Sequence, residues 1–137
     1  MTNEVKKTRP EFRNVGFGQI LTDYKLPLPG KVSILHRVSG VGLFLSLWAL
    51  LWLFDLSLTS EISFATFSNV VGYPIVKLLL LGLIWAYLHH FCAGIRFLLL
   101  DMHIGVDKPS ARKSAGVVLA VSLPLAALVG LKLFGVF

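Results

Sequence analysis

The chain is poor in charge and almost free of cysteine. Only 15% of its 137 residues are charged, against about 25% in an ordinary soluble domain, and 55% are hydrophobic. Its single cysteine, Cys92, excludes an intrachain disulfide, and we interpret it as a small packing residue. The chain also lacks a glycine-rich dinucleotide fingerprint and the cysteine set of an iron–sulfur cluster. These absences argue against a soluble redox enzyme and predict one small integral membrane unit instead.

Three long apolar stretches predict an all-α membrane protein. The spans cover about residues 33–58, 74–100 and 115–136, each long enough to cross a bilayer, and together they form a three-helix transmembrane anchor over 33–137. Residues 1–32 are polar and proline-containing, so we predict an irregular cytoplasmic segment that touches a soluble partner or remains a loose tail. This segment has no apolar core typical of a secretory signal peptide, and its acidic residues argue against a transit peptide.

Basic residues are distributed unevenly between the two ends of the predicted spans. Seven precede Val38 and four lie in or beside the second connection, whereas only Lys77 and Lys132 lie on the other side. Because basic residues concentrate on the cytoplasmic side, this predicts a cytoplasmic N-terminus and a periplasmic C-terminus for a multi-pass protein of a bacterial inner membrane. The net charge of +6 therefore reflects topology and contact with membrane lipids, and we expect no nucleic acid as a partner.

The second span carries two adjacent histidines, His89 and His90, near its middle. An ionisable group at that depth is costly, so it marks a candidate functional site. Counting in steps of four, His90 shares one helical face with the small residues Gly82, Ala86 and Gly94. Such a face has room for a flat macrocycle ligated by imidazole, but it equally suits the close approach of another helix. The two interpretations are compatible, because the approaching helix can carry a second ligand.

No second histidine of the chain is well placed to complete the coordination of an iron porphyrin held by His90. At 1.5 Å per residue, His90 lies ~9 Å from Arg96 along the helix, near mid-membrane. His36 and His103 are expected close to the cytoplasmic surface, and His89 points about 100° away from His90. A six-coordinate haem would therefore need its other ligand from another polypeptide. Without a CxxCH sequence, such a haem would be held by coordination and not by thioether bonds.

A second polar face lies where the first span enters the membrane from the cytoplasm. It follows the spacing i, i+3, i+4, i+7 and consists of Ser33, His36, Arg37 and Gly40. One interpretation is a quinone pocket, in which Ser33 and Arg37 hydrogen-bond an oxygen and the guanidinium stabilises the negative charge formed on reduction. Another is contact of His36 or Arg37 with haem propionates. The alternative is that both side chains only anchor the helix at the lipid headgroups.

These segments resemble a known family. Its patterns are roughly Arg-Pro, then S-x-x-H-R-x-S/T, then H-x-x-x-G-x-R-x-x-x-x-D. The chain resembles the cytochrome b membrane-anchor subunit of succinate dehydrogenase, with matching residues at Arg9-Pro10, at Ser33, His36, Arg37 and Ser39, and at His90, Gly94, Arg96 and Asp101. The two motifs occur in the right order and accompany three spans, so the resemblance covers nearly the whole chain.

The resemblance implies a role in complex II (succinate:ubiquinone oxidoreductase), an enzyme of the tricarboxylic acid cycle and of electron transport. Electrons from succinate would pass through a flavoprotein subunit and an iron–sulfur subunit to ubiquinone. This chain would contribute to quinone reduction without a catalytic residue for succinate oxidation. His90 would be an axial ligand of the haem b iron, with the other ligand from a second small membrane-anchor subunit. Ser33 and Arg37 would line the quinone site, and His36, Arg37 and Arg96 would bind the haem.

The chain departs from the family pattern at three positions. Phe97 stands where His is frequent, Leu100 where an aromatic residue or Met is common, and His103 where a small residue is usual. The departures bear on the propionate contacts and not on the axial ligand. The alternatives are the anchor of a fumarate reductase or other quinol oxidoreductase, a haem-free structural anchor, and a small transporter or regulatory subunit. The paired motifs argue against the last.

Overall fold

The computed structural model describes Gly16, Gly18 and residues 25–136. This part of the chain forms four α-helices and no strand: α2 (Leu28–Thr59), α3 (Glu61–Gly72), α4 (Pro74–Asp101) and α5 (Lys108–Leu133). The predicted all-α fold class is therefore confirmed. Most of the predicted cytoplasmic segment 1–32, including Arg9-Pro10, lies outside the described residues.

Helices α2, α4 and α5 are each long and apolar enough to cross a membrane, which agrees with three predicted spans. Helix α2 begins at Leu28, earlier than the predicted span, because Pro29 sits in its first turn. The backbone N–H groups of a first turn have no partner in the helix, so proline starts the helix there and does not break it. Within α5, the sequence also accommodates Pro124 without ending the helix.

Side-chain caps mark the starts of α3 and α5. Ser60 is the N-cap of α3, where a capping box forms: Ser63 N–H donates to Ser60 Oγ at 3.1 Å, and Ser60 N–H donates to Ser63 Oγ at 2.9 Å. Asp107 is the N-cap of α5, and its carboxylate accepts the Ser110 N–H at 3.0 Å. The bonds from Ser110 hold the pKa of the Asp107 carboxyl below its ordinary value, so the cap carries a negative charge at neutral pH.

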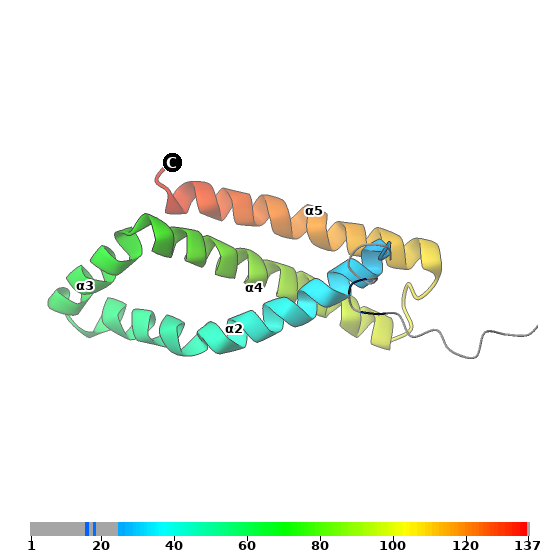
Figure 1. Cartoon of the computed structure of the whole chain (residues 1–137), viewed down its shortest axis with the longest axis horizontal. Helices are drawn as coiled ribbons and strands as arrows, with labels where there is room; N and C mark the ends of the chain where they lie inside the picture. The colour runs from blue at the N-terminus through cyan, green and yellow to red at the C-terminus, as the bar shows by residue number, and fades with distance from the viewer. Residues whose placement is uncertain (1–15, 17, 19–24, 137) are drawn as a thin grey trace, which may run out of the picture.

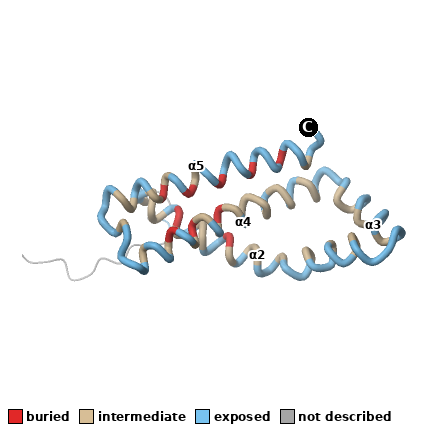
Figure 2. Tube along the Cα trace, turned by 180° about the vertical axis from the view of Figure 1, so that it is seen from behind, coloured by how far each residue is buried: buried red, intermediate tan, exposed pale blue. Residues whose placement is uncertain are grey.

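The three long helices do not form an even bundle. Helix α5 runs back along α4, whereas α2 crosses α4 at an angle and separates from it towards α3, which bridges the open end (Figure 1). A groove of ≈ 500 Å³ lies between the diverging halves of α2 and α4. All three helices meet only at the other end, where Val32, Ala93, Ala115 and Val118 form the core. Figure 2 shows the buried residues at this crossing and along α5.

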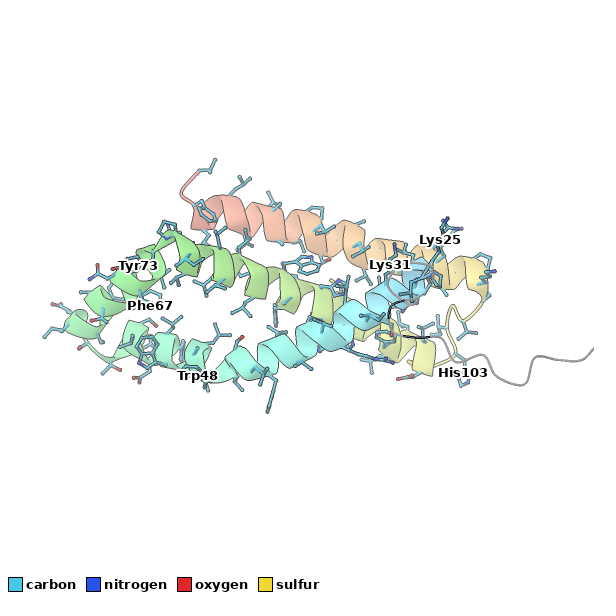
Figure 3. All side chains as sticks on the ribbon, viewed as in Figure 1. Lys25, Lys31, Trp48, Phe67, Tyr73 and His103 are labelled. Atoms are coloured by element: carbon cyan, nitrogen blue, oxygen red, sulfur yellow. The ribbon has the colours of Figure 1, made fainter. Side chains whose placement is uncertain are left out.

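The surface is apolar and the core is made of small residues, as suits a protein solvated by lipid. Large side chains face outwards, among them Phe44 (76% exposed) and Trp48 (74%). The two ends of the molecule differ: Lys25, Lys31 and His103 lie at the end where the helices meet, and Phe67 and Tyr73 at the end where α2 and α4 diverge (Figure 3). Basic residues at one end of the spans agree with the uneven charge distribution in the sequence.

The end of α4 contains a backbone conformation that favours glycine. His103 adopts a left-handed conformation with φ 61°, and two hydrogen bonds close the helix end: His103 N–H to Leu100 O at 2.9 Å and Ile104 N–H to Leu99 O at 3.0 Å. This is a Schellman motif, in which glycine is the usual residue at the left-handed position. A small residue at this position would therefore have a backbone explanation.

Replacing His103 with Gly is expected to stabilise the protein by about 0.5–1 kcal/mol. Glycine enters the left-handed region without steric cost, and its greater freedom in the unfolded chain offsets part of the gain. The measurement is the thermal unfolding midpoint in detergent. His103→Ala is the control, because alanine removes the imidazole and keeps the Cβ. A Gly variant no more stable than the Ala variant would contradict a backbone origin.

Candidate functional site

The imidazole of His90 lies in the contact between α2 and α4. Its Nδ1 is 2.9 Å from the backbone oxygen of His36 and 3.3 Å from Ser39 Oγ. Ser39 Oγ donates to the same His36 oxygen at 3.0 Å. Because a carbonyl oxygen only accepts hydrogen bonds, Nδ1 of His90 must carry the proton. In the neutral tautomer with that proton, Nε2 keeps a lone pair, and Nε2 takes part in no hydrogen bond with the described residues.

A second histidine covers one face of this ring. The imidazoles of His36 and His90 stack with centroids 4.0 Å apart and planes 10° from parallel. The ring of Phe97 lies 5.0 Å from that of His36 on the same side of α4. The sequence placed His36 near the cytoplasmic surface, and the structure brings it into direct contact with His90. Stacking and the hydrogen bond together restrict the rotation of His90.

Two glycines allow this contact, one on each helix. A Cβ added at Gly40 of α2 would lie 2.8 Å from Cε1 of His90, closer than real Cβ atoms come. A Cβ at Gly94 of α4 would lie 3.7 Å from Nε2 of His36. Each histidine thus packs against the glycine four residues beyond the other histidine. The missing side chain is essential at Gly40, which makes room for the His90 ring, whereas a Cβ at Gly94 would be in ordinary van der Waals contact with His36.

His89 has a different environment, although it is adjacent in the chain. It is 0% exposed, and neither ring nitrogen has a hydrogen-bond partner. Its ring lies 5.4 Å from that of Trp85, inside the chain and away from the stack of His36 and His90. A fully enclosed imidazole leaves no space for a macrocycle, so this environment favours His90 over His89 as a ligand.

The remaining predicted site residues lie apart from His90. Arg96 is buried in the contact with α5, where Nε donates to Ser114 Oγ at 3.0 Å and Nη2 donates to Ala111 O at 3.3 Å. Ser33 is half-buried on α2, and Arg37 is exposed. Neither side chain hydrogen-bonds another described residue. The structure therefore brings His36 and Gly40 to His90, and leaves Ser33 and Arg37 on the accessible part of α2.

The sequence did not predict that Ser39 and Gly40 position His90. Ser39 is buried and bonds both His36 and His90, while Gly40 is the point of closest approach. A signal was present, since both spans carry the spacing His-x-x-x-Gly, at His36 and Gly40 and at His90 and Gly94. On antiparallel helices, two matching His-x-x-x-Gly segments place each histidine opposite the glycine of the other segment.

Comparison with known proteins agrees with this geometry. Residues 7–129 match the family of succinate dehydrogenase/fumarate reductase transmembrane subunits. The succinate dehydrogenase cytochrome b556 subunit of Paracoccus denitrificans is 34% identical over 105 residues, which cover 77% of this chain and 81% of that protein. The subunit of the same name from Coxiella burnetii is 33% identical over 113 residues, covering 80% and 89%. That of Rickettsia felis is 36% identical over 85 residues, covering 62% and 65%. The three spans, the paired motifs and these relatives lead to one conclusion: the chain belongs to the succinate dehydrogenase/fumarate reductase transmembrane subunit family.

Proposed function

We propose that the chain is the cytochrome b membrane anchor of a succinate dehydrogenase. It would hold haem b through His90 and form part of the site where ubiquinone is reduced. The family covers subunits of both succinate dehydrogenases and fumarate reductases, and the relatives reported above are all named for succinate dehydrogenase. Those names favour transfer of electrons to a quinone over the reverse reaction.

The hydrogen bond between Nδ1 of His90 and the carbonyl of His36 is the observation that carries this proposal. A histidine that ligates a metal typically donates its other N–H to a carbonyl or carboxylate, which fixes the tautomer and the direction of the ring. Here that bond leaves Nε2 with its lone pair. The donor chemistry of His90 therefore fits an iron ligand.

The ligand set fits a haem better than a bare metal ion. The described residues contain no group of three or more His, Cys, Asp and Glu side chains that could hold an ion. A zinc site takes three or four ligands from the protein, whereas a haem brings four ring nitrogens and needs only axial ligands. When bound, the haem supplies one-electron redox chemistry. A second small membrane-anchor subunit would supply the other axial ligand.

Residues at the basic end of the spans would bind the haem propionates. His36, stacked on His90, and Arg37, exposed one residue later, are both available there. Arg96 already donates from Nε and from one N–H of Nη2 to α5, so Nη1 and the second N–H of Nη2 remain for such a contact. We therefore assign Arg96 a smaller share of this task than the sequence motif implies.

The quinone site would be built on the entry of α2. Ser33 and Arg37 lie one helical turn apart, and an exposed guanidinium without a partner in the described chain can bind a quinone oxygen. The rest of the pocket would come from the iron–sulfur subunit and the second anchor subunit, with the flavoprotein beyond them. This arrangement requires the basic end of the spans to face the cytoplasm of a bacterial inner membrane, as the charge distribution favours.

Replacing His90 with Ala is expected to abolish or strongly weaken the haem band of the purified complex, because the iron loses an axial ligand. The measurement is a reduced-minus-oxidised spectrum, normalised to the anchor protein. His89→Gln is the matched control and should keep the band. Loss of the band in the His89 variant alone would reassign the ligand.

Gly40→Ala is expected to reduce haem content and shift the absorption band, because the new methyl group would collide with Cε1 of His90. Gly42→Ala is the control, since a Cβ at this glycine on the same helix would meet nothing within 4 Å. The haem-to-protein ratio and the band position check the prediction. Equal effects of the two substitutions would show that general helix packing, and not the position of His90, is responsible.

Arg37→Ala and Ser33→Ala are expected to lower ubiquinone reduction at least tenfold and by a few-fold respectively, because charged hydrogen bonds are roughly twice as strong as neutral ones. Succinate oxidation measured with a soluble artificial acceptor should be unchanged. Arg37→Lys tests whether charge alone suffices. Parallel losses in both assays would indicate an assembly defect instead of a quinone site.

A further inference from the structure

Two adjoining hollows lie between the first turns of α2 and α5, at the end where the three long helices meet. One, of ≈ 540 Å³, is lined by Lys31, Lys108 and Arg112 and by the apolar start of α2. The other, of ≈ 550 Å³, is lined by Lys108, Arg112 and Lys113. Because the hollows share Leu28, Lys108 and Arg112, they form one surface, which we call the basic groove.

The basic groove carries positive charge without a compensating negative one. Its four cationic side chains are all exposed. Among the described residues, no carboxylate lines either hollow. The acidic residue next to Lys108, Asp107, accepts the Ser110 N–H with its carboxylate and caps the helix. Like charges gathered at one place repel one another, so an anion bound among them is stabilised.

The basic groove lies apart from the residues proposed to hold haem and quinone. No described residue of α4 lines it, so His90 takes no part in it. On α2, Lys31 lies about 140° around the helix from His36 and about 120° from Arg37. Leu28 forms the floor of the groove and packs from there against the core of the three helices. The proposed function therefore makes no use of this charge.

The groove opens at membrane level, and the α5 face below it is apolar. Both helices that form it are long and apolar enough to cross a membrane, and the groove lies at their first turns. Four, seven and eleven residues after Arg112 come Gly116, Leu119 and Leu123, which share its face of α5. Leu123 is 52% exposed and lies ~16 Å from Arg112 along the helix, about half the apolar thickness of a bilayer. An acyl chain of one leaflet covers that depth.

We propose that the basic groove binds the phosphate of an anionic phospholipid, whose acyl chain continues along α5 into the bilayer. Lys and Arg near the membrane surface attract anionic lipids, and basic pockets between spans suit their headgroups. Arg112, which lines both hollows, can bind a phosphate with two parallel N–H bonds, and the lysines add point charges. An acidic soluble protein matches the charges but not the apolar face below them. The bound lipid offsets the repulsion and joins the start of α2 to that of α5.

The first test is native mass spectrometry of the whole complex, released from nanodiscs of phosphatidylglycerol and phosphatidylcholine in equal parts. We expect the complex to retain phosphatidylglycerol preferentially, and Lys108→Gln/Arg112→Gln to lower that retention at least about threefold, because two of the four cations are lost. Lys77→Gln/Lys132→Gln is the control, since it removes the same charge at the other end of the spans and should leave retention unchanged. Equal losses in the two double variants would overturn the proposal, because they would indicate unspecific attraction.

The second test is the unfolding midpoint of the detergent-solubilised complex. Phosphatidylglycerol should raise the midpoint of the unsubstituted complex and of Lys108→Arg/Arg112→Lys, which keeps both cations in the groove. It should raise that of Lys108→Gln/Arg112→Gln by less than half as much. Lys31→Gln/Lys113→Gln removes the other two charges and should behave in the same way, so the test does not depend on one variant.

Two outcomes would assign the groove to another occupant and overturn the proposal. Inorganic phosphate at the same concentration should have little effect on the midpoint, and an effect equal to that of phosphatidylglycerol would indicate an anion site without a lipid. Loss of the soluble subunits from Lys108→Gln/Arg112→Gln, with retention of phosphatidylglycerol unchanged, would indicate a protein partner in the groove.

Discussion

The reciprocal contact between two histidines and two glycines is the constraint on which the site depends. His90 packs against Gly40 of α2, and His36 packs against Gly94 of α4. The contact brings the backbones close enough for a ring nitrogen of one helix to bond a main-chain oxygen of the other. Main-chain oxygens in a helix do not rotate as side chains do, so the direction of the His90 ring follows from the crossing of two helices.

The two adjacent histidines have different environments because successive residues of a helix point about 100° apart. Lipid provides no hydrophobic drive for helices to associate, so small residues and interhelical hydrogen bonds hold them together. His90 lies at the α2 contact, where one ring nitrogen is bonded and the other remains available. His89 is turned by about 100° into the interior, where its ring is fully enclosed. The same side chain therefore has a hydrogen-bonded ring in the contact with α2 at one position and a fully enclosed ring at the next.

Much of the fold could be predicted from the sequence, because its signals are local. Apolar length gives the spans, and the basic residues distinguish the two ends. The start of α2 was harder to predict, since prolines break a helix interior but begin a first turn, and composition alone does not separate the two cases. The direction of Arg96 could not be predicted. Its long side chain can reach either neighbouring helix, and the choice depends on where α5 supplies Ser114 and Ala111.

Helix α5 carries no proposed ligand, yet it determines which face of α4 remains for α2. Its stripe of small residues lets it lie close along α4, and Leu81 against Gly130 fixes one end of that contact. At the other end it accepts the buried guanidinium of Arg96 with a hydroxyl and a main-chain oxygen, neutral groups that satisfy the donors. With Arg96 bonded to α5, the face of α4 that carries His90 and Gly94 packs against α2. The third span thus binds Arg96 while α2 binds His90, which is why a motif can place these two side chains six residues apart and still give them separate surroundings.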